Sequence, residues 1–165
     1  MQNLNVAIEY IKSEEYLSWV VSNLKWCEHG SDLIDYFDYE GLEEEYANSN
    51  ERKIIVKRYI QSRIREILKE FKEEQQELLY RTIYSNSKPN EYDFYGHFWS
   101  SREDTNPCVE QDFNEEYLLT CAFVPEIIDW VETLKSRMDF LYGKKEKEYY
   151  LKKCKIKLIN IEKIN

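Results

Sequence analysis

Residues 51–84 read ERKIIVKRYIQSRIREILKEFKEEQQELLYRTIY and contain no glycine or proline. An apolar stripe recurs along them at helical spacing, formed by Val56, Ile60, Ile64, Ile67, Phe71 and Leu78. We therefore expect one long central helix here. At 1.5 Å per residue it would extend roughly 50 Å, whereas a compact domain of this length is only about 40 Å across. The helix should then either break near the polar run KEEQQE or project and lean on another chain.

Shorter segments on both sides of this stretch also show helical spacing. One stripe at i, i+3, i+4 and i+7 is formed by Leu17, Val20, Val21 and Leu24. Helical order returns in NEEYLLTCAF, residues 114–123, and again after Pro125, which suits a first helical position. The sequence therefore predicts a mainly α protein. We expect residues 1–165 to form a single-domain bundle of five to seven helices.

Two segments depart from the helical pattern. Residues 85–112 contain Pro89 and Pro107 and show no helical period, so we expect a long aromatic and acidic loop. Alternation over YDFYGHFW, residues 92–99, allows one short strand within it. The Lys-rich C-terminal segment 143–165 is ambiguous: Leu151, Cys154, Leu158 and Ile161 fit a helix, while residues 155–159 also fit a strand.

The formal net charge of -9 restricts the kind of partner. A general affinity for nucleic acid or anionic lipid is disfavoured, because both carry negative charge. The longest stretches without a charged residue reach about half of the roughly 20 residues that a membrane span needs. Four dispersed cysteines do not form the dense pattern of a secreted disulfide framework. We expect a soluble, cytoplasmic protein with no membrane partner.

An acidic run precedes the predicted central helix. Residues 27–50 hold eight Asp or Glu and no Lys or Arg, with aromatic residues between them. If residues 32–45 are helical, their carboxylates occur about every 3 Å, close to the phosphate spacing of a DNA strand. Such a face suits a protein partner with a basic surface. The predicted partner-binding residues here are Asp32, Asp35, Tyr36, Asp38, Tyr39, Glu40, Glu43, Glu44 and Glu45.

A second interpretation of the acidic run remains open. The following helix begins with four cations, Arg52, Lys53, Lys57 and Arg58. Cations at a helix N-terminus are unfavourable against the helix dipole. They make sense if the acidic run folds back and neutralises them. The sequence does not decide whether the run is exposed or paired internally.

The aromatic stretch 92–104 is the second candidate binding surface, with five large aromatic residues, a histidine and an arginine. Loops of this kind often carry function. On a strand, Tyr95, His97 and Trp99 would share one face, and we predict that they contact the partner. The alternative is an aromatic strand buried against the helices.

Motifs for catalysis and for cofactors are lacking. His97 is the only credible general base, with Asp93, Glu103 or Asp104 as orienting carboxylates. There is no CxxC, HxxxH or HExxH pair for zinc, no Gly-rich phosphate loop and no GxSxG elbow. We therefore predict no catalytic residue, no metal and no cofactor, and a protein that is not an enzyme.

These observations favour a non-enzymatic acidic protein that binds and inhibits a partner with a basic surface. Phage counter-defence proteins and toxin-neutralising immunity proteins are classes that such an inhibitor would suit, by analogy. The richness in Lys, Asn, Ile and Tyr is typical of AT-rich genomes, including many of bacteria and phages. One alternative is a helical scaffold that forms a homodimer through residues 51–84. A second alternative is an enzyme that uses His97 with nearby carboxylates.

Overall fold

A computed structural model describes residues 2–22, 49–74, 76–102, 115–138 and 147–164. Internal contacts divide the chain into two compact units. The helical unit comprises Met1–Glu73 and Trp130–Lys145, and the sheet unit comprises Glu74–Asp129 and Glu146–Asn165. The chain therefore leaves the helical unit, returns to it, and leaves it a second time.

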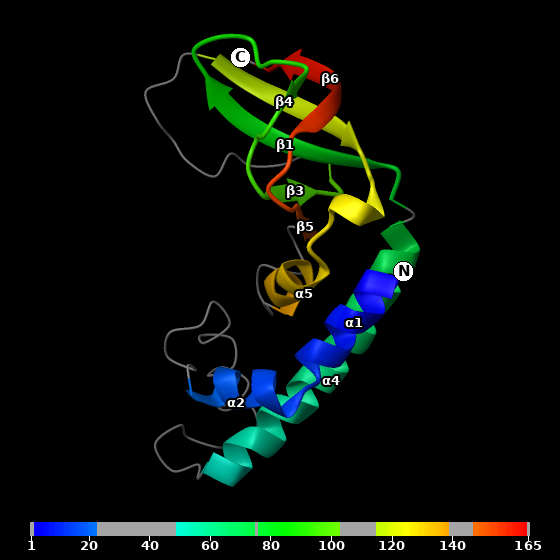
Figure 1. Ribbon diagram of the computed structural model, residues 1–165, viewed down its shortest axis with the longest axis vertical. Helices are drawn as coiled ribbons and strands as arrows, with labels where there is room; N and C mark the ends of the chain where they lie inside the picture. Colours follow the sequence, from blue (N-terminus) through cyan, green and yellow to red (C-terminus); the bar gives the residue numbers. More distant parts are fainter. Residues whose placement is uncertain (1, 23–48, 75, 103–114, 139–146, 165) are drawn as a thin grey trace. The chain divides into compact units, whose positions relative to one another are not determined.

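The architecture is α+β, so the predicted all-α, mainly helical bundle is wrong. Six strands form one antiparallel sheet in the order β2-β6-β4-β1-β3-β5 (Figure 1). The strands are β1 (Leu78–Ser85), β2 (Tyr92–Asp93), β3 (Phe98–Ser100), β4 (Glu115–Ala122), β5 (Glu148–Tyr150) and β6 (Ile156–Lys163). A 3₁₀ turn, η1 (Pro125–Ile127), follows β4 and has proline at its start.

The helical unit is built around the predicted apolar stripe. Its described helices are α1 (Gln2–Ile11), α2 (Glu14–Ser22), α4 (Ser49–Glu74) and α5 (Trp130–Met138). Within this unit α1 packs against α5 and also contacts α2. The stripe residues exposed by 5% or less are Val56, Ile60, Ile64 and Ile67. No helix in the described ranges is long and apolar enough to span a lipid bilayer.

The long helix breaks within its polar run KEEQQE, residues 72–77. Helix α4 ends at Glu74, and β1 starts at Leu78. Residues 78–85, LLYRTIYS, favour strand because they include Tyr, Thr and Ile. Strand β1 pairs with β4 on one side and with β3 on the other. Residues 51–84 are therefore not one helix, and only the α4 part could pack against a second copy as the predicted homodimer requires.

Strand β4 was predicted as a helix, and its burial explains the error. Every residue from Tyr117 to Cys121 is buried, with exposure of at most 7%. A strand buried on both faces reads as a continuous apolar run, which periodicity cannot separate from a helix. Its eight-residue ladder with β1, from Leu78 opposite Ala122 to Ser85 opposite Glu115, forms the centre of the sheet.

The two remaining segments also contribute strands. Of the two readings left open for the C-terminal segment, the structure has a strand, β6, which pairs with β4 and β2. The predicted loop 85–112 carries β2 and β3 in its described part. Strand β5 lies at one margin of the sheet, where the amide of Asp129 donates to the carbonyl of Tyr150 at 2.8 Å. That bond covers part of an otherwise open edge.

A buried ionic network joins α4 to α5 within the helical unit. Arg63 is 2% exposed and donates from Nη1 to Glu66 at 3.0 Å and to Glu70 at 2.8 Å. Its Nε donates to the backbone carbonyl of Arg137 at 2.9 Å. Arg137 is fully buried, lies 3.6 Å from the other oxygen of Glu70, and stacks over Phe71 at 4.6 Å. Glu70 therefore compensates two buried cations.

Replacing Glu70 with glutamine should destabilise the protein strongly, because two buried guanidinium groups would lose their shared counter-charge. We expect the free energy of unfolding to fall by about 3 kcal/mol or more. Urea denaturation followed by circular dichroism measures the change. The matched control is Glu73→Gln, whose exposed side chain lies 3.6 Å from Lys69 and should cost less than about 1 kcal/mol. Equal losses in both variants would contradict the assigned role of Glu70.

Cys121 is fully buried on β4, and burial raises the pKa of its thiol to about 12, with a smaller contribution from nearby Cys154. The thiol of the unfolded chain ionises at about pH 8.5. The folded state therefore holds a proton that the unfolded state releases. The resulting contribution to stability is complete below that pH and declines as the pH rises toward 12.

We expect the wild type to lose about 1.4 kcal/mol more stability per pH unit above pH 9 than the Cys121→Val variant. Urea midpoints at pH 8, 9 and 10 give the two slopes. Cys154→Ser should retain nearly the whole wild-type slope, because burial is the main cause of the shift at Cys121. If the stability of the wild type and of Cys121→Val fell equally with rising pH, the Cys121 thiol would not be the source of the pH dependence.

Candidate functional site

The aromatic stretch 92–99 does not form one strand, because the chain turns at Gly96. Gly96 has φ of +90°, a conformation that side chains with a Cβ rarely adopt. A Cβ on Gly96 would also lie 2.8 Å from Nη2 of Arg81 on β1. Nη1 of Arg81 donates to the backbone carbonyl of Phe98. Glycine is therefore favoured by the backbone conformation, and a Cβ at this position would also have to displace the end of the Arg81 side chain.

The turn separates the three residues predicted to share one face. Trp99 is 1% exposed, and its indole N–H donates to the carbonyl of Gly96 at 3.2 Å, so it belongs to the core. Tyr95 is half-buried and donates from its hydroxyl to the carbonyl of Asn90 at 2.5 Å. Burial, followed by the charge of Asp93, raises the pKa of Tyr95 above its usual value. Tyr95 and His97 remain near the surface, whereas Trp99 does not.

Four rings from three segments form an aromatic cluster, defined here as Phe94, His97, Phe98 and Tyr150. The imidazole of His97 stacks on Tyr150 with 4.6 Å between ring centroids and an angle of 9°. Phe94 meets His97 edge-on at 5.0 Å, and Phe98 meets Tyr150 edge-on at 5.1 Å. Phe98 and Tyr150 are also direct partners in the β3–β5 ladder. Sequence reasoning missed Tyr150, which lies 53 positions after His97 and comes close only through strand pairing.

His97 is held by two reciprocal bonds to Leu151. Its Nδ1 donates to the carbonyl of Leu151 at 2.7 Å, and the amide of Leu151 donates to the carbonyl of His97 at 2.7 Å. In the described part of the chain, no carboxylate bonds the ring. The carboxylate of Asp93 instead accepts from the amide of Phe94 at 2.8 Å. The other two candidate orienting groups, Glu103 and Asp104, lie outside the described residues.

The residues that the structure describes contain no group of three or more His, Cys, Asp or Glu side chains that could hold a metal ion. The contacts of His97 orient its ring and pack it against other rings. This arrangement suits a rigid binding surface. The stacked rings offer contact area to a partner, and their packing already restricts side-chain rotation.

Strand pairing brings lysines of the C-terminal segment toward the aromatic stretch. Tyr92, which is 60% exposed, lies opposite Lys157 in the β2–β6 ladder. The ammonium group of Lys155 lies 5.8 Å from the centre of the Tyr92 ring. The described charges around this surface are therefore mixed rather than acidic.

The negative charge of the protein is concentrated in two segments. The described residues carry 20 Lys or Arg and 18 Asp or Glu, which nearly cancel. Residues 23–48 carry eight acids and one base, and residues 103–114 carry four acids and no base. The nine predicted partner-binding residues between Asp32 and Glu45 lie outside the described ranges. Of the four cations at the start of α4, Lys57 lies 3.5 Å from Glu14 of α2, and both side chains are largely exposed.

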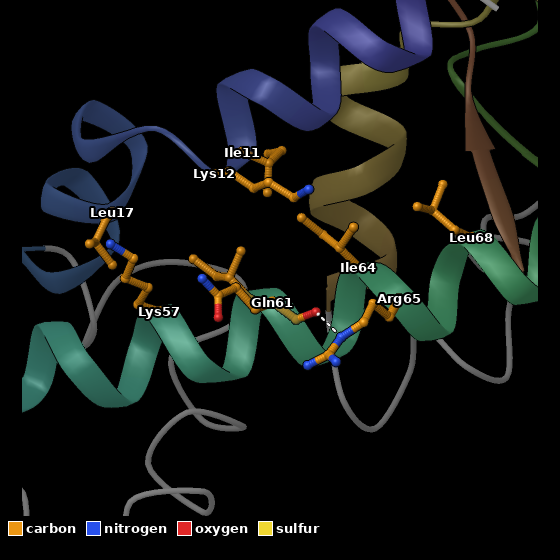
Figure 2. Close-up of a pocket in the computed structure, with 9 residues that line it drawn as sticks. Ile11, Lys12, Leu17, Lys57, Gln61, Ile64, Arg65 and Leu68 are labelled. Atoms are coloured by element: carbon orange, nitrogen blue, oxygen red, sulfur yellow. Dashed lines mark hydrogen bonds between the residues drawn. The ribbon is translucent and has the colours of Figure 1, made fainter.

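A basic groove lies within the helical unit, between α4 and the end of α1 (Figure 2). Its volume is about 360 Å³, within the range of ligand-binding pockets. Its apolar lining consists of Ile11, Leu17, Ile60, Ile64 and Leu68, and its cations are Lys12, Lys57 and Arg65. We call this site the basic groove. The sequence signal for this site is a pair of parallel i, i+4, i+8 rows on α4, one apolar and one polar.

Comparison of the chain with protein-family models, with characterised proteins and with solved structures finds no match.

Substituting Gly96 with alanine should destabilise the sheet unit, because the new Cβ would meet both an unfavourable φ and the Arg81 guanidinium. We expect a loss of about 1–3 kcal/mol, measured by urea denaturation. The same substitution in an Arg81→Ala background should cost less, because only the backbone strain remains. Equal costs in the two backgrounds would show that the close approach of Arg81 does not constrain position 96.

Proposed function

We propose that this protein is a non-enzymatic binding protein that recognises a basic surface on another protein and inhibits that partner by covering it. The observation that carries the proposal is the placement of the charge. Residues 23–48 and 103–114 together hold twelve acids and one base, while the described residues are close to neutral. An excess confined to two segments gives a directed negative potential, which attracts cationic partners over distances near the Debye length.

The aromatic cluster and Tyr92 supply a second element of such an interface. Tyr92 is 60% exposed and Phe98 is 38% exposed, and both belong to strands of the sheet. Rigid aromatic side chains bury much area at low entropic cost, which is why protein interfaces are rich in them. Acidic segments would then increase the association rate, and the aromatic residues would slow dissociation.

The test compares two fourfold charge reversals in the full-length chain. The first variant changes Asp35, Asp38, Glu43 and Glu44 to Lys. The control changes four acids that are exposed and make no described ion pair: Glu9, Glu77, Glu126 and Glu162. Partners are captured from a lysate of the native cell, identified by mass spectrometry, and their affinities measured against rising salt.

We expect a cationic partner whose affinity for the wild type falls steeply with salt. The first variant should lose at least tenfold in affinity, and the control much less. Tyr92→Ser should increase the dissociation rate and leave the salt dependence unchanged. Equal losses of affinity in both fourfold variants would show that only the total charge matters. No loss in either variant would show that the acidic segment does not contact the partner. A salt-insensitive homodimer without a captured partner, seen by light scattering, would favour the scaffold alternative.

A further inference from the structure

Helices α1 and α2 of the helical unit share a connected row of aromatic rings. The ring centroids of Tyr10 and Tyr16 lie 5.6 Å apart, and those of Tyr16 and Trp19 lie 6.0 Å apart with an angle of 21°. We call these three residues the aromatic ridge. Tyr16 is 1% exposed, whereas Tyr10 is 37% and Trp19 is 47% exposed. The ridge therefore has a buried centre and two accessible ends.

The turn between the two helices holds the rings in place. The amide of Ser13 donates to the carbonyl of Tyr10 at 3.0 Å, and the hydroxyl of Ser13 accepts from the amide of Tyr16 at 3.1 Å. The second bond is a helix N-cap, which satisfies one of the free amides at the start of α2. A partner that binds here meets rings whose positions are already set, so little side-chain entropy is lost on binding.

The ridge offers apolar area that solvent can reach. Val6 lies one turn before Tyr10 on the same face of α1 and is 65% exposed. Val6, Tyr10 and Trp19 together expose on the order of 300 Å². Single exposed apolar residues are ordinary, whereas a connected patch of this size is often functional. A stable interface takes about 800 Å² from each partner, so the ridge fits an anchor within a larger contact surface.

The charges beside the ridge favour a cationic ligand. The ammonium group of Lys135 on α5 lies 5.9 Å from the centre of the Trp19 ring and is paired with Glu132 at 2.7 Å. Trp19 thus already accepts a cation at its ring. Glu15 lies one turn before Trp19 on the same face of α2, is exposed, and forms no ion pair with any described residue. Its carboxylate is available to a cation that approaches the ring.

From these contacts we infer that the aromatic ridge anchors an arginine of the cationic protein partner, an inference that rests on the proposed function. A guanidinium group stacks flat on an aromatic ring and pairs with a carboxylate in the same contact, which the strongly hydrated ammonium of lysine does less well. Tyr10 and Trp19 supply the rings, and Glu15 supplies the carboxylate. A second copy of the chain fits less well, because a twofold contact over the ridge would bring Glu15 of both copies together.

The experiment follows the indole N–H signals of the isotope-labelled, full-length chain by NMR. Each of the four tryptophans is a separate reporter: Trp19 lies in the ridge, Trp26 belongs to the segment 23–48, and Trp99 and Trp130 are buried. Trp19→Phe and Trp26→Phe assign the first two signals. The probes are a peptide of four Arg-Gly-Ser repeats and the same peptide with Lys or with Glu in place of Arg.

We expect the arginine peptide to shift the Trp19 signal saturably and to leave the two buried tryptophans unchanged. The lysine peptide should need about threefold higher concentration for the same shift, and the glutamate peptide should have no effect. Glu15→Gln and Tyr10→Leu should each weaken the binding that Trp19 reports by about twofold to fivefold, because the first removes the ion pair and the second removes a ring. The matched control, Glu126→Gln, makes the same charge change at an exposed site of the sheet unit and should leave the affinity unchanged.

Several results would overturn the inference. A response of Trp26 without Trp19 would assign the arginine peptide to the acidic run. Equal responses of Trp19 to the arginine and lysine peptides would leave only net charge as the cause. A dimer of the wild type that dissociates in Trp19→Met, seen by light scattering, would assign the ridge to a second copy.

Capture of the cationic partner separates this inference from the proposed function. We expect Trp19→Met to weaken the affinity for that partner about tenfold, as the loss of an interface anchor does. If the fourfold charge reversal in the acidic run abolishes capture but Trp19→Met binds as the wild type does, the proposed function stands and the ridge is not the anchor. If Trp19 responds selectively to the arginine peptide but no cationic partner is captured, the proposed function fails and the arginine site remains.

Discussion

Glu70 divides its carboxylate between two arginines that have almost no contact with solvent, and the placement of α5 on α4 depends on this sharing. In the sequence, α5 comes after β1 to β4, so it is far from α4 along the chain. A generic apolar contact would allow α5 to slide or rotate, whereas Arg63 bonds a specific carbonyl, that of Arg137. Buried charges tolerate few alternative arrangements, because each one left unpaired is costly. The return of the chain to the helical unit is therefore specified by polar chemistry rather than by hydrophobic burial alone.

Charge has two different roles in this protein. Within the helical unit it is buried, paired and structural. In residues 23–48 and 103–114 it is present in excess, and in the basic groove the opposite sign borders an apolar floor. The described parts of the protein are close to neutral, so its net negative charge comes from these two segments, and the proposed binding of a cationic partner rests on that uneven distribution. The aromatic cluster adds area that charge alone does not supply.

Sequence reasoning located the aromatic site in part. It singled out Tyr95, His97 and Trp99 because strand alternation would place them on one face. The positive φ of Gly96 breaks that alternation, so Trp99 turns into the core while His97 stacks on Tyr150. The stacking partner could not be foreseen, because it depends on the β3–β5 register. The basic groove was missed for the same reason: its opposite wall comes from α1 and α2.

Local pattern was sufficient for the apolar stripe of α4, because one face of that helix is buried and the other is solvated. For the end of this helix the sequence left two outcomes open, a break near the polar run KEEQQE or a projecting end, and the structure has the break, at Glu74. Strand β4 is buried on both faces, so its apolar run carried no period that distinguishes strand from helix. The identity of β4, the sheet order and the Arg63–Glu70–Arg137 network were decided by contacts between residues far apart in the chain. Such contacts leave no repeat in the sequence, because the two partners lie far apart along the chain and meet only in the folded structure.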